Sequence, residues 1–226
     1  MSKVISCFGC SFTGGVFTDS EPRESWPYRL SLARPDLKIY NFGREATSVL
    51  FSLNMIEQVA DQLQSDLIIT QLTEPTRMTF YDPGFKLNLK HDLLQISNNY
   101  WVLPMNLKGI WPFNGVSGKK QTKENFSNLS TAEKYQVLEK LMVMHEDQNH
   151  FDPEYRAFFH RTNSLSDLVF FHRKLYREVP GLEDIACVEK LLGTEKFLEL
   201  VIDKGFHFGQ PGSEWIANWV LEKLKL

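Results

Sequence analysis

Apolar and polar positions in the first part of the chain follow two alternating periods. Short runs rich in β-branched and aromatic residues, typical of buried strands, are separated by stretches whose apolar residues recur every three or four positions, as on one face of a helix. The runs that predict strands are Val4 to Phe8, Leu37 to Phe42 and Asp66 to Leu72. The helix signals between them begin at Ser25 and at Thr47 or Ser48, residue types that cap helices. Short links between such elements predict parallel strand pairing through helical crossovers, an α/β fold.

The alternation breaks in the middle of the chain and then resumes. In the middle, Gly, Asn, Lys and aromatic residues mix, and Ser130-Thr-Ala-Glu133 has the spacing of a capping box, which predicts a helix. We interpret residues 81–163 as one part-helical insertion in a single domain of residues 1–226. The later pattern predicts a helix over Ser164 to Tyr176, a strand over Ile185 to Val188, a short helix around Glu195 to Val201, and a helix opening at Gly212.

The composition is that of a single domain able to build one core. The chain has 226 residues, of which 42% are hydrophobic, and a formal net charge of −3. That charge gives no general attraction to nucleic acid or to an anionic membrane surface, so we expect neither as a partner. No stretch approaches the roughly 18 apolar residues of a membrane span, and the first residues lack the pattern of a secretory signal. We therefore expect a cytoplasmic protein.

Cysteine and histidine spacing predicts neither a metal site nor a cofactor. Cys7-Phe-Gly-Cys10 is formally a C-x-x-C motif, but it falls on a strand and the following turn rather than at the start of a helix. His145 and His150 would point about 140° apart on a helix, which is poor for one metal ion. His172 lies on a predicted helix and is interpreted as a surface or core residue whose hydrogen bonds are satisfied within the protein. No glycine-rich phosphate-binding motif follows a predicted strand, so nothing supports a nucleotide.

Three stretches resemble the motifs of the SGNH (GDSL-like) hydrolase family, especially its divergent phage and bacterial members. The first stretch follows the first predicted strand, the second follows the second predicted strand, and the third precedes the C-terminal helix. In this sequence they read Phe8-Gly-Cys-Ser-Phe-Thr13, Asn41-Phe-Gly43-Arg-Glu-Ala46 and Asp203-Lys-Gly-Phe-His207. The resemblance covers residues 1–78 and 164–226. It implies a three-layer, flavodoxin-like fold, with a parallel sheet and helices on both faces.

The resemblance also implies a catalytic serine and its partners. It assigns the nucleophile to Ser11, the general base to His207, and a backbone donor of the oxyanion hole to Gly43 or Ala46. In such a site the imidazole takes the serine proton and a carboxylate orients the imidazole. Backbone N–H groups that are already in place stabilise the oxyanion formed when the serine attacks an acyl carbon.

Two positions of these motifs differ from the family pattern. Cys10 stands where the family usually has aspartate, and Lys204 rather than aspartate stands three residues before His207. Asp203 lies one place earlier in the chain. On a turn this carboxylate can still reach the imidazole, so we assign the orienting role to Asp203.

The segment after the third strand, Leu72-Thr-Glu-Pro-Thr-Arg77, lacks the asparagine of the family's Gly-x-Asn motif. One oxyanion donor is then either missing, which typically costs about 100- to 1000-fold in rate, or replaced by Thr73, Thr76 or Arg77. Glu74 is the alternative carboxylate for orienting the imidazole. Arg77 could instead hold a carboxylate or phosphate of a substrate, or form a surface ion pair with Glu74.

These residues favour a serine-dependent ester hydrolase that forms an acyl-enzyme on Ser11. Its substrate would be an O-acyl or O-acetyl ester of a carbohydrate or a small metabolite. Aromatic residues of the insertion would stack on sugar rings; they are Tyr100, Trp101, Trp111 and Phe113. Two alternatives stay open. One is a catalytically degenerate binding or assembly module, in which Ser11 only caps a helix and His207 is bonded within its own loop; the other is an acyltransferase that uses the same site.

Overall fold

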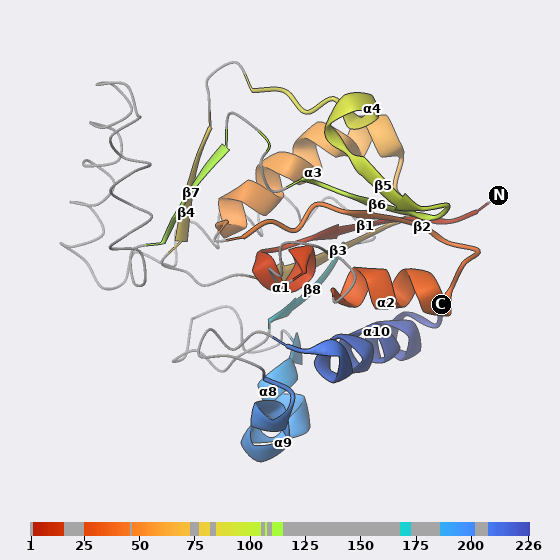
Figure 1. Cartoon of the computed structure of the whole chain (residues 1–226), viewed down its shortest axis with the longest axis vertical. Helices are drawn as coiled ribbons and strands as arrows, with labels where there is room; N and C mark the ends of the chain where they lie inside the picture. Colours follow the sequence, from red (N-terminus) through yellow and green to blue (C-terminus); the bar gives the residue numbers. More distant parts are fainter. Residues whose placement is uncertain are drawn as a thin grey trace.

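The computed structural model describes residues 2–15, 25–45, 47–72, 77–81, 85–104, 107, 110–114, 168–172, 186–201 and 208–226. Their strands form a seven-stranded sheet and a separate two-stranded pair (Figure 1). The strands of the large sheet, in spatial order, are β5 (Leu94–Ser97), β6 (Tyr100–Val102), β2 (Lys38–Asn41), β1 (Val4–Phe8), β3 (Leu67–Leu72), β8 (Leu168–His172) and β9 (Ala186–Cys187). The separate antiparallel pair is β4 (Arg77–Tyr81) and β7 (Ile110–Asn114).

Neighbouring strands of the large sheet run parallel, except that the edge strand β5 runs antiparallel to β6. The order β2-β1-β3-β8-β9 is that of flavodoxin-like doubly wound folds, in which the chain reverses direction beside the first strand. The α/β fold with a flavodoxin-like parallel sheet is therefore confirmed.

Helices cover both faces of this sheet, which gives the three expected layers (Figure 1). On one face α2 and α10 pack against each other and against β1, where Trp26, Ile216 and Ile5 share one core. On the other face α3 packs over β1, where Met55 and Phe8 belong to a second core. The described helices are α1 (Ser11–Gly14), α2 (Trp26–Ala33), α3 (Val49–Leu63), α4 (Leu89–Asp92), α8 (Val188–Leu192), α9 (Thr194–Glu199) and α10 (Gln210–Leu224).

Strand β1 shows why the chain builds two cores. Successive side chains of a strand point to opposite faces, so Ile5 and Cys7 enter the core under α2 and α10, whereas Phe8 enters the core under α3. All three side chains are completely buried. Burial on both faces explains the nearly continuous apolar run from which this strand was predicted.

The predicted helix starts before α2 and α3 are confirmed. The Ser25 hydroxyl accepts a hydrogen bond from the Tyr28 N–H at 3.4 Å, and Pro27 occupies the first turn of α2, where its missing N–H costs nothing. Of the two caps considered for α3, Ser48 is the one observed, because its hydroxyl accepts from the Phe51 N–H at 3.3 Å. The Thr47 hydroxyl instead donates to backbone carbonyls.

Two predictions for the last third of the chain were wrong. The segment Ser164 to Tyr176 was predicted to be a helix, but its residues Leu168–His172 form strand β8. His172 therefore ends a strand rather than lying on a helix. The segment Leu-Val-Phe-Phe-His consists largely of residue types that favour strands, and a short apolar run does not distinguish a buried strand from a helix. The C-terminal helix begins at Gln210 rather than Gly212, with Pro211 in its first turn.

Part of the segment treated as an insertion is continuous with the main sheet. Strands β5 and β6 extend the sheet beyond β2, and β6 pairs with β2 in parallel from Ile39 to Asn41. The helices predicted after Ser130 and Asp152 lie outside the described residues, and the assignment of residues 81–163 as an insertion in one domain stays a prediction.

Strand β6 carries Tyr100, whose burial makes stability sensitive to alkaline pH. The side chain is 0% exposed, and burial raises the pKa of its hydroxyl well above the ordinary value of about 10. In the unfolded chain the hydroxyl ionises near pH 10, whereas in the folded protein it stays neutral. The contribution of this group to stability is therefore complete below about pH 10 and is lost as the pH rises toward the folded pKa.

We predict that this one group lowers the free energy of unfolding by up to about 1.4 kcal/mol per pH unit above pH 10. Tyr100→Phe should remove this pH-dependent contribution. The free energies of unfolding by urea of the wild type and the variant should therefore converge or cross as the pH is raised from about 9 to 11. Burial also raises the pKa of Cys7, but the resulting contribution to the pH dependence of stability is the same in the wild type and in the variant. Parallel curves would contradict the burial of a neutral Tyr100 hydroxyl.

Candidate active site

The carboxyl ends of β1 and β2 bring the first two sequence motifs together. These strands pair in parallel up to Cys7 and Asn41, so the segments that follow them leave the sheet at the same edge. Ser11 follows β1 and Gly43 follows β2. In open parallel sheets this is the edge at which ligands bind, and it is where the sequence places the candidate site.

Ser11 is the first residue of α1, the short helix that follows β1. The cap position before it is held by Cys10, whose backbone is extended and whose side chain makes no capping hydrogen bond. Ser11 therefore lies in the first turn of α1 rather than at its cap position. The Ser11 side chain is 2% exposed, so little of it can be reached from solvent in this conformation.

The two turns that carry Ser11 and Gly43 are in direct backbone contact. A Cβ atom added to Gly43 would lie 2.3 Å from the Gly14 nitrogen and 2.6 Å from the Thr13 carbonyl carbon. A Cβ added to Gly14 would in turn lie 2.7 Å from the Gly43 oxygen. Only glycine permits this approach, because any larger residue would push the two turns apart.

The Asn41 side chain joins the same two turns by hydrogen bonds. Its Nδ2 donates to the Thr13 carbonyl oxygen at 2.7 Å, and its Oδ1 accepts from the Gly43 N–H at 2.9 Å. Nδ2 also donates to the Tyr100 hydroxyl at 2.7 Å. Asn41 is 1% exposed, so these bonds form away from water, where an unmade bond would be costly.

Further buried polar groups extend from this contact. The Tyr100 and Ser25 hydroxyls lie 3.0 Å apart. Thr13, whose carbonyl oxygen accepts from Asn41, also takes part through its side chain: its hydroxyl donates to Gln71 Oε1 at 2.9 Å and accepts from Trp26 Nε1 at 3.4 Å. The network therefore connects the turn after β1 to α2 and to the ends of β2, β3 and β6.

The backbone donors of the turn after β2 are partly engaged. Gly43 donates its N–H to Asn41, and Arg44 donates its N–H to the Gly9 carbonyl oxygen at 3.1 Å. Of the two residues expected to donate to an oxyanion, Gly43 thus already has an acceptor within the protein. Ala46 lies outside the described residues, and the oxyanion role of either residue stays a prediction.

The third motif cannot be placed directly, because Asp203 and His207 lie outside the described residues. The next residue, Phe208, is buried and packs edge-on against Phe197, with ring centroids 5.4 Å apart. Helix α10 begins two residues later. Leu226, which follows the end of this helix, lines the same hollow as Ser2, which precedes β1, so the start of the helix lies toward the carboxyl edge of the sheet that holds Ser11.

The predicted site residues that follow β3 cannot be assigned from the structure either. Thr73, Glu74 and Thr76 lie outside the described residues. Arg77 begins β4, opposite Asn114 of β7, and its side chain is not described. Their predicted roles in binding an oxyanion or a substrate, or in orienting the imidazole, stay predictions.

The aromatic surface expected for sugar binding is corrected at one position. Tyr100 is buried in the core and cannot stack on a ligand. Trp101 is half-buried and stacks on Tyr40, with ring centroids 4.7 Å apart and planes inclined by 14°. The side chains of Trp111 and Phe113, on β7, are not described.

Sequence reasoning missed the residues that hold this edge together. Asn41 was noted only as a member of a motif, although a single amide at the end of an apolar strand signals a buried hydrogen-bonding role. Tyr100 was assigned to a surface because it stands among turn-forming residues. Nothing in the local sequence indicates that it lies beside Asn41, since 59 positions separate them.

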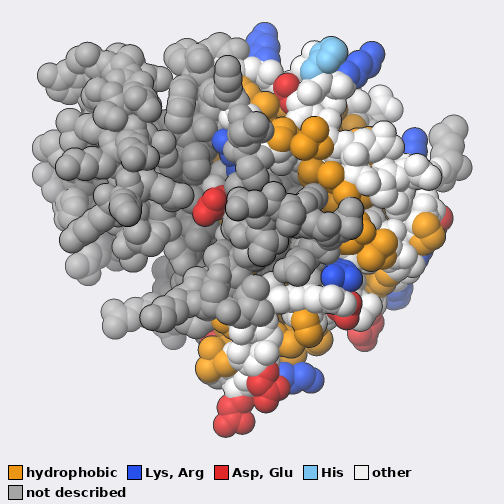
Figure 2. Space-filling view, viewed as in Figure 1, with side chains coloured by type: hydrophobic (Ala, Val, Ile, Leu, Met, Phe, Trp, Pro, Cys, Tyr) orange, Lys and Arg blue, Asp and Glu red, His pale blue; other side chains and the backbone are white. Residues whose placement is uncertain are grey.

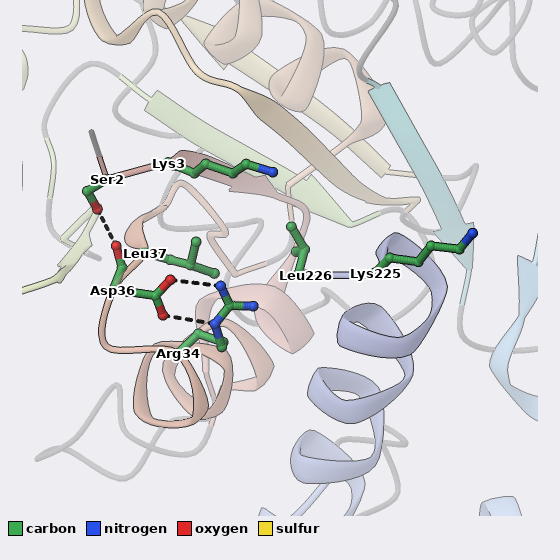
Figure 3. A pocket seen from close by; sticks show the side chains of 7 residues that line it. All are labelled: Ser2, Lys3, Arg34, Asp36, Leu37, Lys225 and Leu226. Carbon is green, nitrogen blue, oxygen red and sulfur yellow. Dashed lines mark hydrogen bonds and ion pairs between the residues drawn. The ribbon is translucent and has the colours of Figure 1, made fainter.

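A surface hollow of about 520 Å³ lies at the opposite edge of the sheet (Figure 3). It is lined by residues that precede β1, precede β2 and end α10, and it contains none of the predicted site residues. Arg34 and Asp36 form a bidentate ion pair there, with distances of 2.8 and 2.7 Å. Lys3 and Lys225 also line this hollow.

On the face seen in Figure 2, both basic and acidic side chains lie over the described elements. Within the described ranges, no three His, Cys, Asp or Glu side chains are grouped as a metal ion would require. None of the helices that the structure describes combines the length and the apolar character needed to span a bilayer.

No family model and no curated protein matches the sequence. The solved structures to which the chain is similar include the following two. One is a member of the lipolytic protein G-D-S-L family from Veillonella parvula DSM 2008, 13% identical, with 97% of each chain covered and a TM-score of 0.44. The other is AlinE4, an SGNH-hydrolase family esterase, 14% identical, with 100% of this chain and 96% of that chain covered and a TM-score of 0.43.

We predict that Gly43→Ala destabilises the protein by about 2–3 kcal/mol, because the new methyl group meets backbone atoms that cannot move independently. The matched control is Gly193→Ala, where an added Cβ meets nothing within 4 Å and only the positive φ of 80° is unfavourable. The control should cost about 1 kcal/mol. Urea unfolding of both variants measures the difference, and equal costs would show that the two turns are not in tight contact.

Proposed function

We propose that the carboxyl edge of the sheet is the active site of a serine-dependent ester hydrolase with Ser11 as the nucleophile. One observation carries the proposal. Ser11 opens the helix directly after β1, and the turn after β2 is held against that helix by the glycine contact and by Asn41. A rigid edge of this kind is what a site needs if its donors are to be in place before the reaction begins.

The proposed reaction proceeds in two steps. The Ser11 oxygen attacks the ester carbonyl carbon while His207 takes the hydroxyl proton, and Asp203, or Glu74 in its place, holds the other imidazole nitrogen. The oxyanion collapses, the alcohol leaves with the proton from the imidazole, and an acyl-enzyme remains. Water then attacks the acyl carbon and gives a proton to His207; as the second oxyanion collapses, the carboxylic acid leaves and the imidazole returns that proton to the Ser11 oxygen.

The oxyanion donors follow from the bonds already made in the turn after β2. Since the Gly43 N–H already donates to Asn41, we assign the oxyanion donors to the backbone N–H of Ser11 and, as the second donor, to that of Ala46. The third donor would come from Thr73, Thr76 or Arg77, which stand where the family motif has asparagine. A site without the asparagine amide should turn over slowly rather than not at all.

A small acyl group fits this site best. Ser11 is almost fully buried, so an acetyl group or a short acyl chain reaches it more easily than a bulky one. The alcohol could be a carbohydrate or another small metabolite, with Trp111 and Phe113 as the remaining candidates for stacking. Transfer of the acyl group to an alcohol instead of water would use the same residues.

The burial of Ser11 also supports a second candidate, a binding or assembly module that has lost catalysis. In that case the buried polar network would serve the fold alone. For either function we propose a cytoplasmic location, since Cys7 and Cys10 are both free thiols, as expected in a reducing compartment.

Reaction with a fluorophosphonate probe distinguishes the two functions. The wild type should be labelled stoichiometrically, Ser11→Ala should not be labelled, and His207→Gln should react at least about 1000-fold more slowly, because the hydroxyl loses its base. Ser2→Ala, at the opposite edge of the sheet, is the control and should react like the wild type. Absence of labelling across pH 6 to 9 would favour the binding module, whereas labelling that survives Ser11→Ala would contradict Ser11 as the nucleophile.

A further inference from the structure

We propose that Tyr100 is a positioning residue of the candidate site, which acts through Asn41 to hold the turns that carry Ser11 and Gly43 in a fixed relative position. The inference rests on the proposed function in one respect, that this position affects reaction at Ser11. The position itself is a property of the fold, so it can be measured without any activity.

The orientation of the Asn41 amide is determined by chemistry. The Thr13 carbonyl can only accept a hydrogen bond and the Gly43 N–H can only donate one, so the amide nitrogen must face Thr13 and the amide oxygen must face Gly43. One hydrogen of Nδ2 remains, and it points to the Tyr100 oxygen at 2.7 Å. Tyr100 therefore completes the hydrogen bonding of the nitrogen.

The hydroxyl of Tyr100 is itself oriented from outside the site. Its oxygen accepts from Asn41, and it shares a second hydrogen bond with Ser25 Oγ, 3.0 Å away, in which either hydroxyl can be the donor. Ser25 caps α2, whose position is set by the core under that helix. The sequence of bonds from Ser25 through Tyr100 to Asn41 thus ties the turn after β1 to a rigid helix.

Removing the Tyr100 hydroxyl leaves an Nδ2 hydrogen buried without an acceptor. The amide can then rotate, which weakens its bonds to Thr13 and Gly43, or the two turns can shift. The glycine contact means that a shift in one turn displaces the other. A displacement of about 1 Å at a reacting group can cost on the order of 100-fold in rate.

The experiment compares Tyr100→Phe with Tyr28→Phe. The first variant keeps the ring and removes only the hydroxyl. The second makes the same chemical change in a ring that packs against Tyr100, with centroids 5.4 Å apart, but whose hydroxyl makes none of the hydrogen bonds described above. Two quantities are measured: amide hydrogen exchange at Gly43 by NMR, and the rate constant and amplitude of fluorophosphonate labelling at Ser11.

In Tyr100→Phe we expect exchange at Gly43 to become about 10-fold faster and the labelling rate constant to fall about 10- to 100-fold, with the amplitude unchanged. Tyr28→Phe should behave like the wild type. A purely structural role would lower the amplitude, which reports the folded fraction, and leave the rate constant unchanged. If Tyr100→Phe does not fold, Ser25→Ala takes its place. This variant should make exchange at Gly43 about 3-fold faster and the labelling rate constant about 3-fold lower, since it removes the partner that orients the Tyr100 hydroxyl.

Unchanged exchange at Gly43, or equal effects of the two tyrosine variants, would overturn the inference. Faster exchange with an unchanged labelling rate constant would also overturn it, because Tyr100 would then hold the turns without affecting Ser11. If the wild type is not labelled at all, the proposed function fails, and exchange at Gly43 still decides whether Tyr100 holds the two turns.

Discussion

The Asn41 amide is the interaction on which the candidate site depends. It connects the carbonyl of Thr13 to the N–H of Gly43, and thereby joins the turn after β1 to the turn after β2. The parallel sheet brings the two turns to one edge, and the glycines allow their backbones to touch, but neither feature determines their exact spacing. The amide does, because both of its bonds are buried and each requires a particular orientation.

A buried polar network of this kind favours rigidity over net stability. Hydrogen bonds that replace bonds to water contribute only about 0.5–1.5 kcal/mol each, whereas an unmade buried bond costs more. The arrangement from Ser25 to Gly43 therefore adds little to folding, yet it strongly disfavours any other placement of the turns. Such a placement has a clear use if Ser11 reacts, since donors in an active site must be held in position beforehand. It has less use in a protein that only binds.

The sequence predicted the local features of the fold well and the long-range ones poorly. Strand β1 and the caps of α2 and α3 were correct, because apolar runs and capping residues act over a few positions. Strand β8 was mistaken for a helix, because its pairing with β3, about a hundred residues away, is what makes it a strand. Tyr100 was misplaced for the same reason, since its environment is created by β2 and α2 rather than by its neighbours in sequence.

The crystal structure of the protein after reaction with a fluorophosphonate is the most direct test of a shared site at this edge. We expect the phosphorus atom bonded to Ser11 Oγ and the imidazole of His207 within about 3 Å of the modified oxygen or of the phosphonate. An unmodified Ser11, or an imidazole on another side of the molecule, would contradict the proposed active site.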